Sequence, residues 1–185
     1  PHQKLLVLDV PAEHVASVVT GLRANSLEAE PSPFRRSTIA CTGIEFCKLA
    51  IVETKATAKV AIDSLEERLG DLSALTPISL HVNGCPNSCA RIQTADIGLK
   101  GQLVMDDDGA QVPGYQVHLG GGLASADREE AGLGRTVRGL KVTADGVPEY
   151  VERITRRYHA DRVETSDGPE PFAVWAHRAD EEALQ

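Results

Sequence analysis

The four cysteines of this 185-residue chain form two close pairs, and the sequence holds no other thiol. Five residues separate Cys41 from Cys47, and three separate Cys85 from Cys89. Four thiolates are the ligand number of a cubane iron–sulfur cluster and of many structural zinc sites. Zinc pairs usually have about two to four intervening residues, so the longer first spacing favours iron.

Three other interpretations of the cysteines remain open at this point. Apolar core cysteines are one, although such residues rarely gather in pairs beside Gly, Pro and Asn. Two disulfides are another, which nothing in the chain excludes by itself, although no apolar signal segment is visible. Zinc is the third. The preferred interpretation is a cluster in a reduced compartment, and it places the protein in the cytoplasm.

Both pairs follow a short apolar run of strand length, at residues 37–41 and 77–82. A long helical pattern at residues 45–69 follows the first pair, and Pro86 suits the first turn of a helix after the second. We therefore expect each pair where a strand ends and a helix begins, so that N–H groups and the helix dipole point at the ligand. The expected buried side of the first helix consists of Phe46, Leu49, Ala50, Ala61, Ile62, Leu65 and Leu69.

Small and amide residues lie beside the cysteines. Gly43 and Gly84 would let the backbone approach the inorganic sulfides closely, where a larger side chain would block it. Asn83 and Asn87 are candidates for hydrogen bonds around the cysteine sulfurs, which tune the potential of a cluster. The two asparagines are equally typical of loops and caps.

The amino-terminal part of the chain predicts a strand at residues 4–10 and a helix after Pro11, with apolar residues on one face. Residues 28–36 show no period and predict an extended linker. Further along, strands at residues 95–104 and 115–119 are expected to form a hairpin around the acidic turn 106–109. We interpret its three aspartates as a solvated turn rather than a calcium site.

The carboxyl-terminal part predicts a strand at residues 136–142 and helices at 148–159 and 171–184. Trp175 is expected to be a packing anchor. The glycine triplet 120–122 is only a weak signal for an anion-binding loop. Two histidines inside predicted strands, His81 and His118, are expected to be core or hydrogen-bonding residues rather than metal ligands.

At the cysteine motifs the sequence resembles the siroheme-dependent sulfite and nitrite reductases. The shared features are the Cys-x5-Cys and Cys-x3-Cys pattern, Thr42 and Gly43 after the first cysteine, and HVNGCPNSCARIQTADIGLKG around the second pair. QVHLGGGL at residues 116–123, RGLKV at 138–142 and PSPFRR at 31–36 also resemble segments of that family.

The resemblance implies an α+β fold, with a mixed sheet and flanking helices. It assigns residues 37–185 to a siroheme/4Fe-4S-binding domain, and residues 1–36 to the remnant of a ferredoxin-like subdomain and a linker. Members of the family have two similar halves, and this chain resembles the carboxyl-terminal half alone. The amino-terminal half of the same enzyme is therefore an expected partner.

The resemblance also implies roles for individual residues. Cys41, Cys47 and Cys85 match ligands of the 4Fe-4S cluster. Cys89 matches the catalytic cysteine that is shared between the cluster and the siroheme iron. Further cofactor contacts are expected from Thr42, Asn83, Gly84, Asn87 and Arg91, and Arg91 is the candidate partner of a siroheme carboxylate.

The implied activity is that of an assimilatory, ferredoxin-dependent sulfite reductase, which reduces sulfite to sulfide with six electrons. A ferredoxin–nitrite reductase is the close alternative, and a non-catalytic iron–sulfur electron-transfer module is the alternative of another class. We expect this chain alone to be inactive, because the family's anion-binding and proton-donating groups belong to the other half. Lys48, Arg91 or Lys100 would have to act as general acids otherwise.

Charge and composition limit the other partners. The net charge of −8 argues against nucleic-acid binding, and no apolar run reaches the length of a membrane span. Ferredoxin is acidic, so it should prefer a basic docking face, either from the other half or from local clusters. Those clusters are Arg35, Arg36, Lys48 and Lys55, or Arg135, Arg138 and Lys141.

Overall fold

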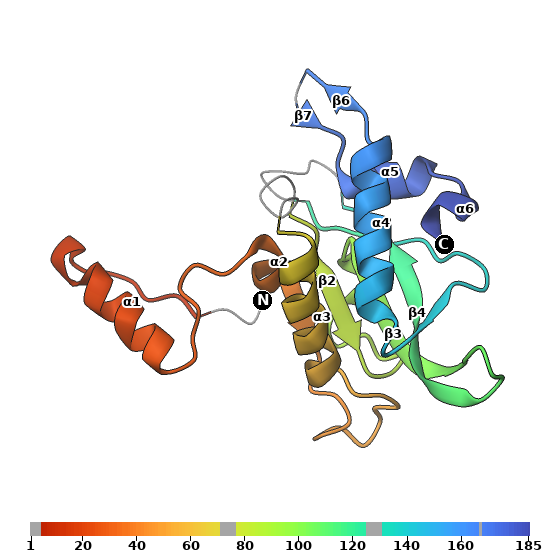
Figure 1. The fold of residues 1–185 in the computed structure, drawn as a ribbon, viewed down its shortest axis with the longest axis horizontal. Coiled ribbons are helices and arrows are strands. Elements are labelled where there is room, and N and C mark those ends of the chain that lie inside the picture. The colour runs from red at the N-terminus through yellow and green to blue at the C-terminus, as the bar shows by residue number, and fades with distance from the viewer. Residues whose placement is uncertain (1–4, 71–76, 125–130, 167) are drawn as a thin grey trace.

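Within the residues that the structure describes, which are 5–70, 77–124, 131–166 and 168–185, a five-stranded mixed sheet lies at the centre of this computed structural model (Figure 1). Its strands, in spatial and chain order, are β1 Thr38–Ala40, β2 Leu80–Asn83, β3 Ile97–Met105, β4 Gln111–Leu119 and β5 Lys141–Thr143. The helices are α1 Val15–Ala24, α2 Pro33–Ser37, α3 Lys55–Arg68, α4 Val147–Asp161, α5 Phe172–Arg178 and α6 Glu181–Leu184. Two 3-10 turns, η1 Ala12–His14 and η2 Ile92–Thr94, and a small hairpin of β6 Glu164–Thr165 and β7 Gly168–Pro169 complete them. This arrangement confirms the expected fold class.

The strand directions follow from the connections. β1, β2 and β3 are parallel neighbours, and α3 is the crossover between the first two. β3 and β4 form the expected antiparallel hairpin, and β5 pairs antiparallel to β4. Asp106 closes the hairpin turn, because its carbonyl accepts a hydrogen bond from the N–H of Gly109 at 3.1 Å. The predicted turn and both hairpin strands are therefore confirmed, and β4 begins four residues earlier than predicted, at Gln111.

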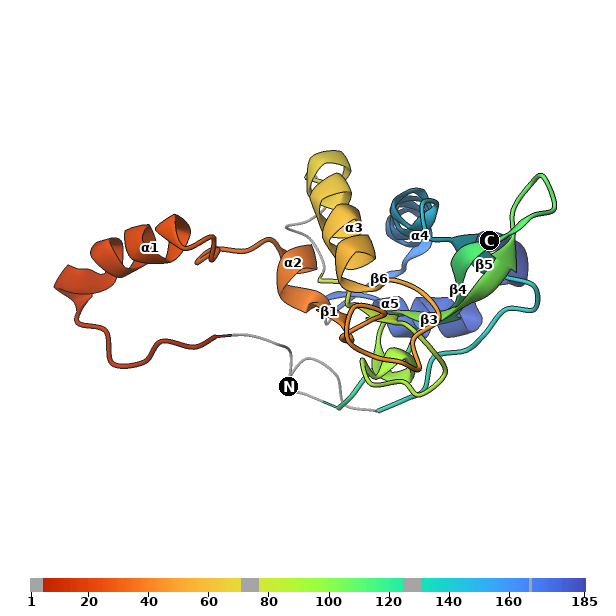
Figure 2. The same cartoon turned by 90° about the horizontal axis from the view of Figure 1, so that it is seen from below.

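One face of the sheet is covered by α3 and α4, which run side by side across it (Figure 2). Apolar residues at every second strand position point into this layer, among them Val82, Leu99 and Val117. α4 matches the predicted helix at 148–159, and its buried side includes Ile154 and Tyr158. Trp175 on α5 is fully buried against Tyr158, which confirms its role as a packing anchor.

The opposite face of the sheet is covered in part by the turn η2 and the loop before it. Gly98 of β3 makes this close packing possible, since a Cβ at that position would overlap the carbonyl oxygen of Ile92. His81 and Asn83 point to this face from β2, and both are buried. The glycines at 120–122 are used in backbone pairing, because Gly120 and Gly121 donate hydrogen bonds to Asp96 and Ala95.

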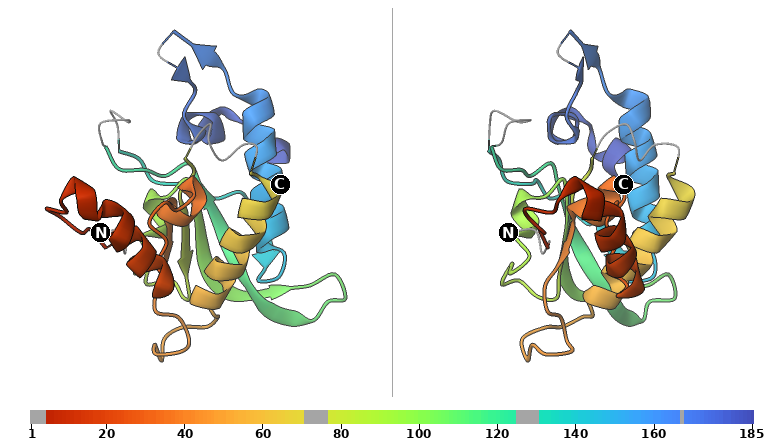
Figure 3. Two further views of the ribbon diagram at one scale, coloured as in Figure 1. Left: turned by 60° about the vertical axis from the view of Figure 1, so that its left-hand side comes forward. Right: turned by 90° about the vertical axis from the view of Figure 1, so that its left-hand side faces the viewer.

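The amino-terminal arm, residues 5–31, stands away from the sheet (Figures 1 and 3). α1 confirms the predicted helix, and none of its residues is buried. Two predictions in this part of the chain are wrong. The described residues of the apolar run, Leu5 to Val10, form no strand, because no neighbouring strand offers them hydrogen bonds. The predicted linker contains α2, which Ser32 caps by accepting the N–H of Arg35 at 3.0 Å.

Other differences concern element ends. The helix expected at 45–69 begins only at Lys55, after a loop of turns, so neither cysteine pair opens a helix. Pro86 lies in a turn, followed by η2. The strand expected at 136–142 is confined to β5, and the terminal helix is divided between α5 and α6 at Ala179. Among the described residues, no helix is both long and apolar enough to cross a membrane.

Candidate metal and cofactor site

The ends of β1 and β2 bring the two cysteine pairs to one edge of the sheet. The N–H of Cys41, directly after β1, donates a hydrogen bond to the carbonyl of Val82 at 3.0 Å. The N–H of Gly84, directly after β2, donates to the Sγ atom of Cys41 at 3.3 Å. Because Cys85 follows Gly84, the parallel register places the first and third cysteines in neighbouring positions. The predicted location at two strand ends is confirmed.

The loop between β1 and α3 holds the first pair and projects beyond the end of the sheet (Figure 3). Gly43 adopts a φ of 69°, and its carbonyl accepts the N–H of Cys47 at 3.0 Å. The same loop returns to the second pair, since the N–H of Ile51 donates to the carbonyl of Gly84 at 2.7 Å. The two cysteine motifs are therefore joined through the N–H of Gly84, which binds the sulfur of Cys41, and through its carbonyl, which binds the N–H of Ile51.

The far end of this loop is fixed by three residues that the sequence prediction missed. Thr54 is fully buried, and its hydroxyl donates to the carbonyl of Cys41 at 2.8 Å. The carboxylate of Glu53 accepts the N–H of Thr54 at 2.9 Å, which lowers the pKa of Glu53 below its usual value. Tyr115 donates its hydroxyl proton to the carbonyl of Glu53 at 2.5 Å, and burial raises the pKa of Tyr115 to about 12. The ETK sequence before a helical pattern is a helix-start signal that would have marked the first two.

The second cysteine loop folds as consecutive turns. Ser88 and Arg91 have left-handed backbone, with φ values of 57° and 56°, and they lie on either side of Cys89. The N–H of Arg91 donates to the carbonyl of Ser88 at 2.8 Å, which closes the turn. The amide side chain of Asn83 binds backbone atoms of this loop, as described below, and does not reach a sulfur by any hydrogen bond of the structure.

All four cysteines are free thiols in the structure. Cys85 is buried, Cys41 and Cys47 are partly exposed, and Cys89 is exposed. The other predicted contact residues divide in the same way, with Gly84 buried, Arg91 partly exposed, and Thr42 and Asn87 exposed. Across the part of the chain that the structure describes, no three His, Cys, Asp or Glu side chains gather closely enough to hold one metal ion.

The side chains expected to form the buried side of the first helix divide into three groups, one of which, Ala50 and Ile62, is partly exposed. Ala61, Leu65 and Leu69 are buried, as predicted. Phe46 and Leu49 are 72% and 65% exposed, because the loop that carries them leaves the sheet before α3 begins. The prediction of buried Phe46 and Leu49 is therefore wrong, and the cysteine loop presents an apolar surface that also includes Ile44 and Ile51.

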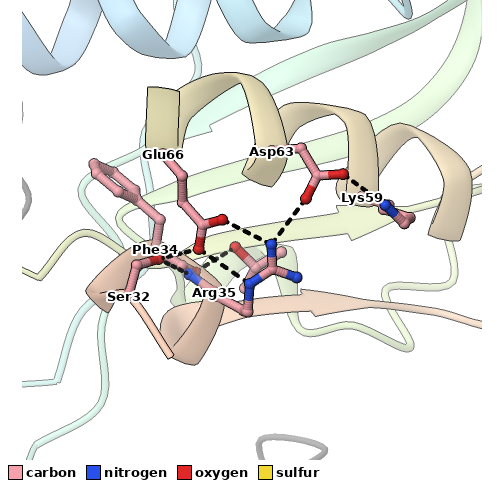
Figure 4. Close-up of polar contacts among 7 residues, drawn as sticks. Ser32, Phe34, Arg35, Lys59, Asp63 and Glu66 are labelled. Carbon is pink, nitrogen blue, oxygen red and sulfur yellow. Dashed lines mark hydrogen bonds and ion pairs between the residues drawn. The ribbon is translucent and has the colours of Figure 1, made fainter. Parts of the chain in front are cut away.

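A polar network joins α2 and the residue before it, Ser32, to α3 (Figure 4). Arg35 of α2 makes two hydrogen bonds to the carboxylate of Glu66, at 3.0 and 2.7 Å, and a third to Asp63 at 2.8 Å. Ser32 donates to Glu66 at 2.6 Å, and Lys59 donates to Asp63 at 2.6 Å. The Arg35 guanidinium lowers the pKa of Glu66, while Lys59, followed by Arg35, lowers that of Asp63.

This network bears on the predicted basic docking faces. Arg35 is already neutralised by two carboxylates, and Lys55 is paired with Glu45. Arg135 donates to backbone carbonyls, including that of Ala179 at 3.2 Å. Three of the predicted docking residues therefore already have partners within the chain: Arg35, Lys55 and Arg135.

The donor set fits an iron–sulfur cluster. None of its four cysteines is in a disulfide, and the sulfur of Cys41 accepts a backbone N–H, which is the kind of contact that stabilises a thiolate bound to iron. Two connected loops supply the ligands, and a four-iron cubane spans a wider ligand set than a single ion does. Cysteine sulfur is also the ligand type that selects such clusters.

Comparison with known proteins gives a consistent result. The family described as "Nitrite and sulphite reductase 4Fe-4S domain" matches residues 32–185. "Sulfite reductase [ferredoxin] 1" of Mycolicibacterium paratuberculosis is 52% identical over the whole chain, which covers 32% of that relative. An "Assimilatory ferredoxin-dependent nitrite reductase" of Haloferax mediterranei is 32% identical over 86% of the chain, covering 26% of that relative.

A solved structure gives the same picture for the fold. The NirA protein of Mycobacterium tuberculosis superposes on this chain with a TM-score of 0.90 at 45% identity, covering all of this chain and 33% of that protein. This chain thus spans about a third of the length of the curated relatives and of the solved structure that it matches.

Proposed function

Because the chain belongs to the nitrite and sulphite reductase 4Fe-4S domain family, we propose that it is the cofactor-holding part of a ferredoxin-dependent sulfite reductase. The observation that carries the proposal is the meeting of the two cysteine motifs at one sheet edge, where Gly84 donates its N–H to the sulfur of Cys41. A domain of this family needs both pairs at one place. The parallel pairing of β1 and β2 supplies that arrangement.

In this proposal Cys41, Cys47 and Cys85 hold the 4Fe-4S cluster, and Cys89 is shared between the cluster and siroheme. When bound, the two cofactors would pass to sulfite the electrons that the proposed donor, ferredoxin, provides. The exposure of Cys89 supports its role, because a shared thiolate must face a second, large group. Arg91 is partly exposed two residues further on, which suits a partner of a siroheme carboxylate. Thr42 and Asn87 are exposed on the two loops and would contact the cofactors from either side.

The rest of the proposal concerns parts outside this chain. The exposed apolar residues of the cysteine loop and of the arm would be covered by the remaining two thirds of an enzyme like the relatives. The unburied α1 supports a separate amino-terminal part. The division after residue 36 stays a proposal, since the family match begins at residue 32 and Phe34 of α2 is buried in the core of the domain. Ferredoxin is the proposed electron donor and the cytoplasm the proposed location.

Sulfite is preferred over nitrite because the relative named as a sulfite reductase shares 52% identity, against 32% for the one named as a nitrite reductase. The test is to measure kcat/KM of the complete natural protein for both anions with reduced ferredoxin. We expect sulfite to be the better substrate. A higher kcat/KM for nitrite would reverse the assignment.

A second experiment tests the shared cysteine. In the complete natural protein, Cys89→Ser should lose both siroheme and turnover, because one change removes a ligand from two groups. Cys41→Ser, the matched control, removes a ligand from the cluster alone and should retain more siroheme. Normal siroheme absorption in Cys89→Ser would refute the assignment of Cys89.

A third experiment tests the division of labour. This chain alone, with its cluster rebuilt, should show no sulfite reduction, because anion binding and proton delivery need groups from the rest of the enzyme. Addition of the missing part as a separate chain should restore siroheme binding before activity. Turnover by the isolated chain would instead assign the proton-donating role to Lys48, Arg91 or Lys100.

A further inference from the structure

Strand β2 presents two polar side chains to the face of the sheet that carries the second cysteine loop. Leu80 and Val82 point into the core beneath α3, so the alternate residues His81 and Asn83 point the other way. His81 is 3% exposed and Asn83 is fully buried. Burial of an amide and an imidazole is costly unless their polar atoms are hydrogen-bonded. Their partners therefore show what the two side chains do.

Asn83 bridges the two ends of the loop that contains Cys85 and Cys89. Its Nδ2 atom donates to the carbonyl of Cys85 at 2.6 Å, and its Oδ1 atom accepts the N–H of Ala90 at 2.9 Å. A carbonyl only accepts and a backbone N–H only donates, so these partners fix the orientation of the amide. One polar atom of Asn83 therefore binds the backbone of Cys85 itself, and the other binds the backbone of Ala90, the residue after Cys89.

His81 holds the next residues of the same loop. Its Nδ1–H donates to the carbonyl of Arg91 at 3.1 Å, and the hydroxyl of Thr94 donates to that same carbonyl at 3.1 Å. Arg91 and Ser88 both have left-handed backbone, which is strained for residues other than glycine and persists only where other contacts enforce it. The hydrogen bonds from His81 and Asn83 to this loop are contacts that can hold the left-handed backbone.

We propose that Asn83, supported by His81, is a positioning residue that fixes the loop of Cys85 and Cys89, and thereby sets where the exposed thiol of Cys89 lies relative to Cys85. This inference rests on the proposed function, in which both cysteines are ligands. Asn83 acts on the sulfurs through the backbone and not by a hydrogen bond to sulfur. Both polar atoms of its amide are bound to the backbone of the loop, so its effect belongs to ligand geometry.

The first experiment measures the loop itself and needs no cofactor. In this chain, Asn83→Leu should increase amide hydrogen exchange at Ala90 by about tenfold relative to the unaltered chain, the effect of losing one hydrogen bond to a buried amide. Asn83→Asp keeps the acceptor for Ala90 and should keep most of its protection. Gln116→Leu is the matched control, because Gln116 lies in the same register row two strands away. Equal exchange at Ala90 in Asn83→Leu and Gln116→Leu would overturn the proposal.

The second experiment measures the consequence for the cluster. In the complete natural protein, Asn83→Leu should shift the midpoint potential and the electron paramagnetic resonance spectrum of the reduced cluster, whereas Gln116→Leu should leave both unchanged. His81→Phe should shift them in the same way. His81→Asn should restore them, because its Nδ2 can replace the Nδ1 donor. An unchanged potential in Asn83→Leu would refute the positioning role.

The outcomes separate this inference from the proposed function. Failure of the proposed function would appear as normal siroheme content in Cys89→Ser, whatever the exchange rate at Ala90. Failure of the positioning role would appear as unaltered Ala90 exchange and unaltered potential in an enzyme whose Cys89→Ser variant has lost siroheme. Should Asn83→Leu not fold, Asn83→Asp decides the second experiment, because it still lacks the donor to Cys85.

Discussion

The N–H of Gly84 lies 3.3 Å from the Sγ atom of Cys41, and this contact joins two motifs that are far apart in the sequence. A side chain at Gly84 would disturb it. An added Cβ would lie 3.0 Å from the Cβ of Ala50 and 3.1 Å from the carbonyl oxygen of Val52, both in the first cysteine loop. The contact therefore depends on a residue without a side chain.

Gly84→Ala should lower the free energy of unfolding by about 1–3 kcal/mol, because the first cysteine loop must move away from β2. Urea denaturation of this chain measures the loss. Gly21→Ala is the control, since no atom lies within 4 Å of a Cβ on that residue of α1. The control should not destabilise the chain. Equal stability of the two variants would show that the loop gives way freely.

Arg35→Gln should lower the free energy of unfolding by about 1 kcal/mol, after allowance for the solvent that screens a side chain 34% exposed. The change leaves Glu66 and Asp63 without their shared guanidinium (Figure 4). Arg23→Gln is the control, because Arg23 meets Glu30 where both side chains are more than half exposed. Its effect should stay within about 0.5 kcal/mol. High salt should reduce the difference between the variants.

Glu170→Gln should lower the free energy of unfolding by about 1–3 kcal/mol at neutral pH, because the buried carboxylate binds Arg178 twice, at 2.6 Å each, and the N–H of Val163. Arg178 holds the pKa of Glu170 below its usual value. This stabilisation is present above the ordinary pKa of a glutamate and is lost as the pH falls through the lowered one. The difference in free energy of unfolding between the unaltered protein and Glu170→Gln should therefore decrease in acid.

The control for this change is Glu164→Gln, since Glu164 is 65% exposed in its pair with Arg162. Chemical denaturation at several pH values measures all three proteins. If the difference in free energy of unfolding between the unaltered protein and Glu170→Gln persisted when the carboxylates are protonated, Glu170 would act through its shape rather than its charge.

His118 makes stability depend on pH near neutrality. Burial, with a smaller contribution from the charge of Lys100, lowers the pKa of His118 below its ordinary value of 6.5. The unfolded chain therefore binds the proton more readily, so stability is full above that value and falls as the pH drops below it. His118→Phe should flatten this part of the stability profile, as measured by chemical denaturation at several pH values. An unchanged slope in His118→Phe would assign the dependence to another group.

The positions of the cysteine pairs could be predicted from the sequence, because apolar runs of strand length end at Cys41 and shortly before Cys85. The course of the loop between β1 and α3 could not be predicted. Phe46 and Leu49 continue the helical spacing of the apolar residues in α3, although they precede that helix. Gly43 has a positive φ that turns the chain, and α3 begins only at Lys55, after Glu53 has accepted the N–H of Thr54. Periodicity reports which residues are apolar, but not whether they face their own core or another surface.

The same reasoning explains the arm and Asn83. The run at Leu5–Leu8 has strand composition, but a strand needs a neighbour, and the described residues supply none. The position of Asn83, two residues before Cys85, marks it as a candidate site residue, but the sequence does not predict its hydrogen-bond partners. They depend on how η2 folds back over β2, which only the close packing at Gly98 makes possible.

The connection from β1 through α3 to β2 has a consequence for how the protein is made. Cys41 and Cys85 become neighbours only when this crossover has closed, which is a slow, non-local event compared with the formation of α3 or of the β3–β4 hairpin. Before closure, a nascent chain offers each cysteine pair separately, with too few ligands to retain a cubane. Insertion of the cluster should therefore follow translation of β2 and closure of the crossover. Until then, the cluster would have to stay on whatever delivers it.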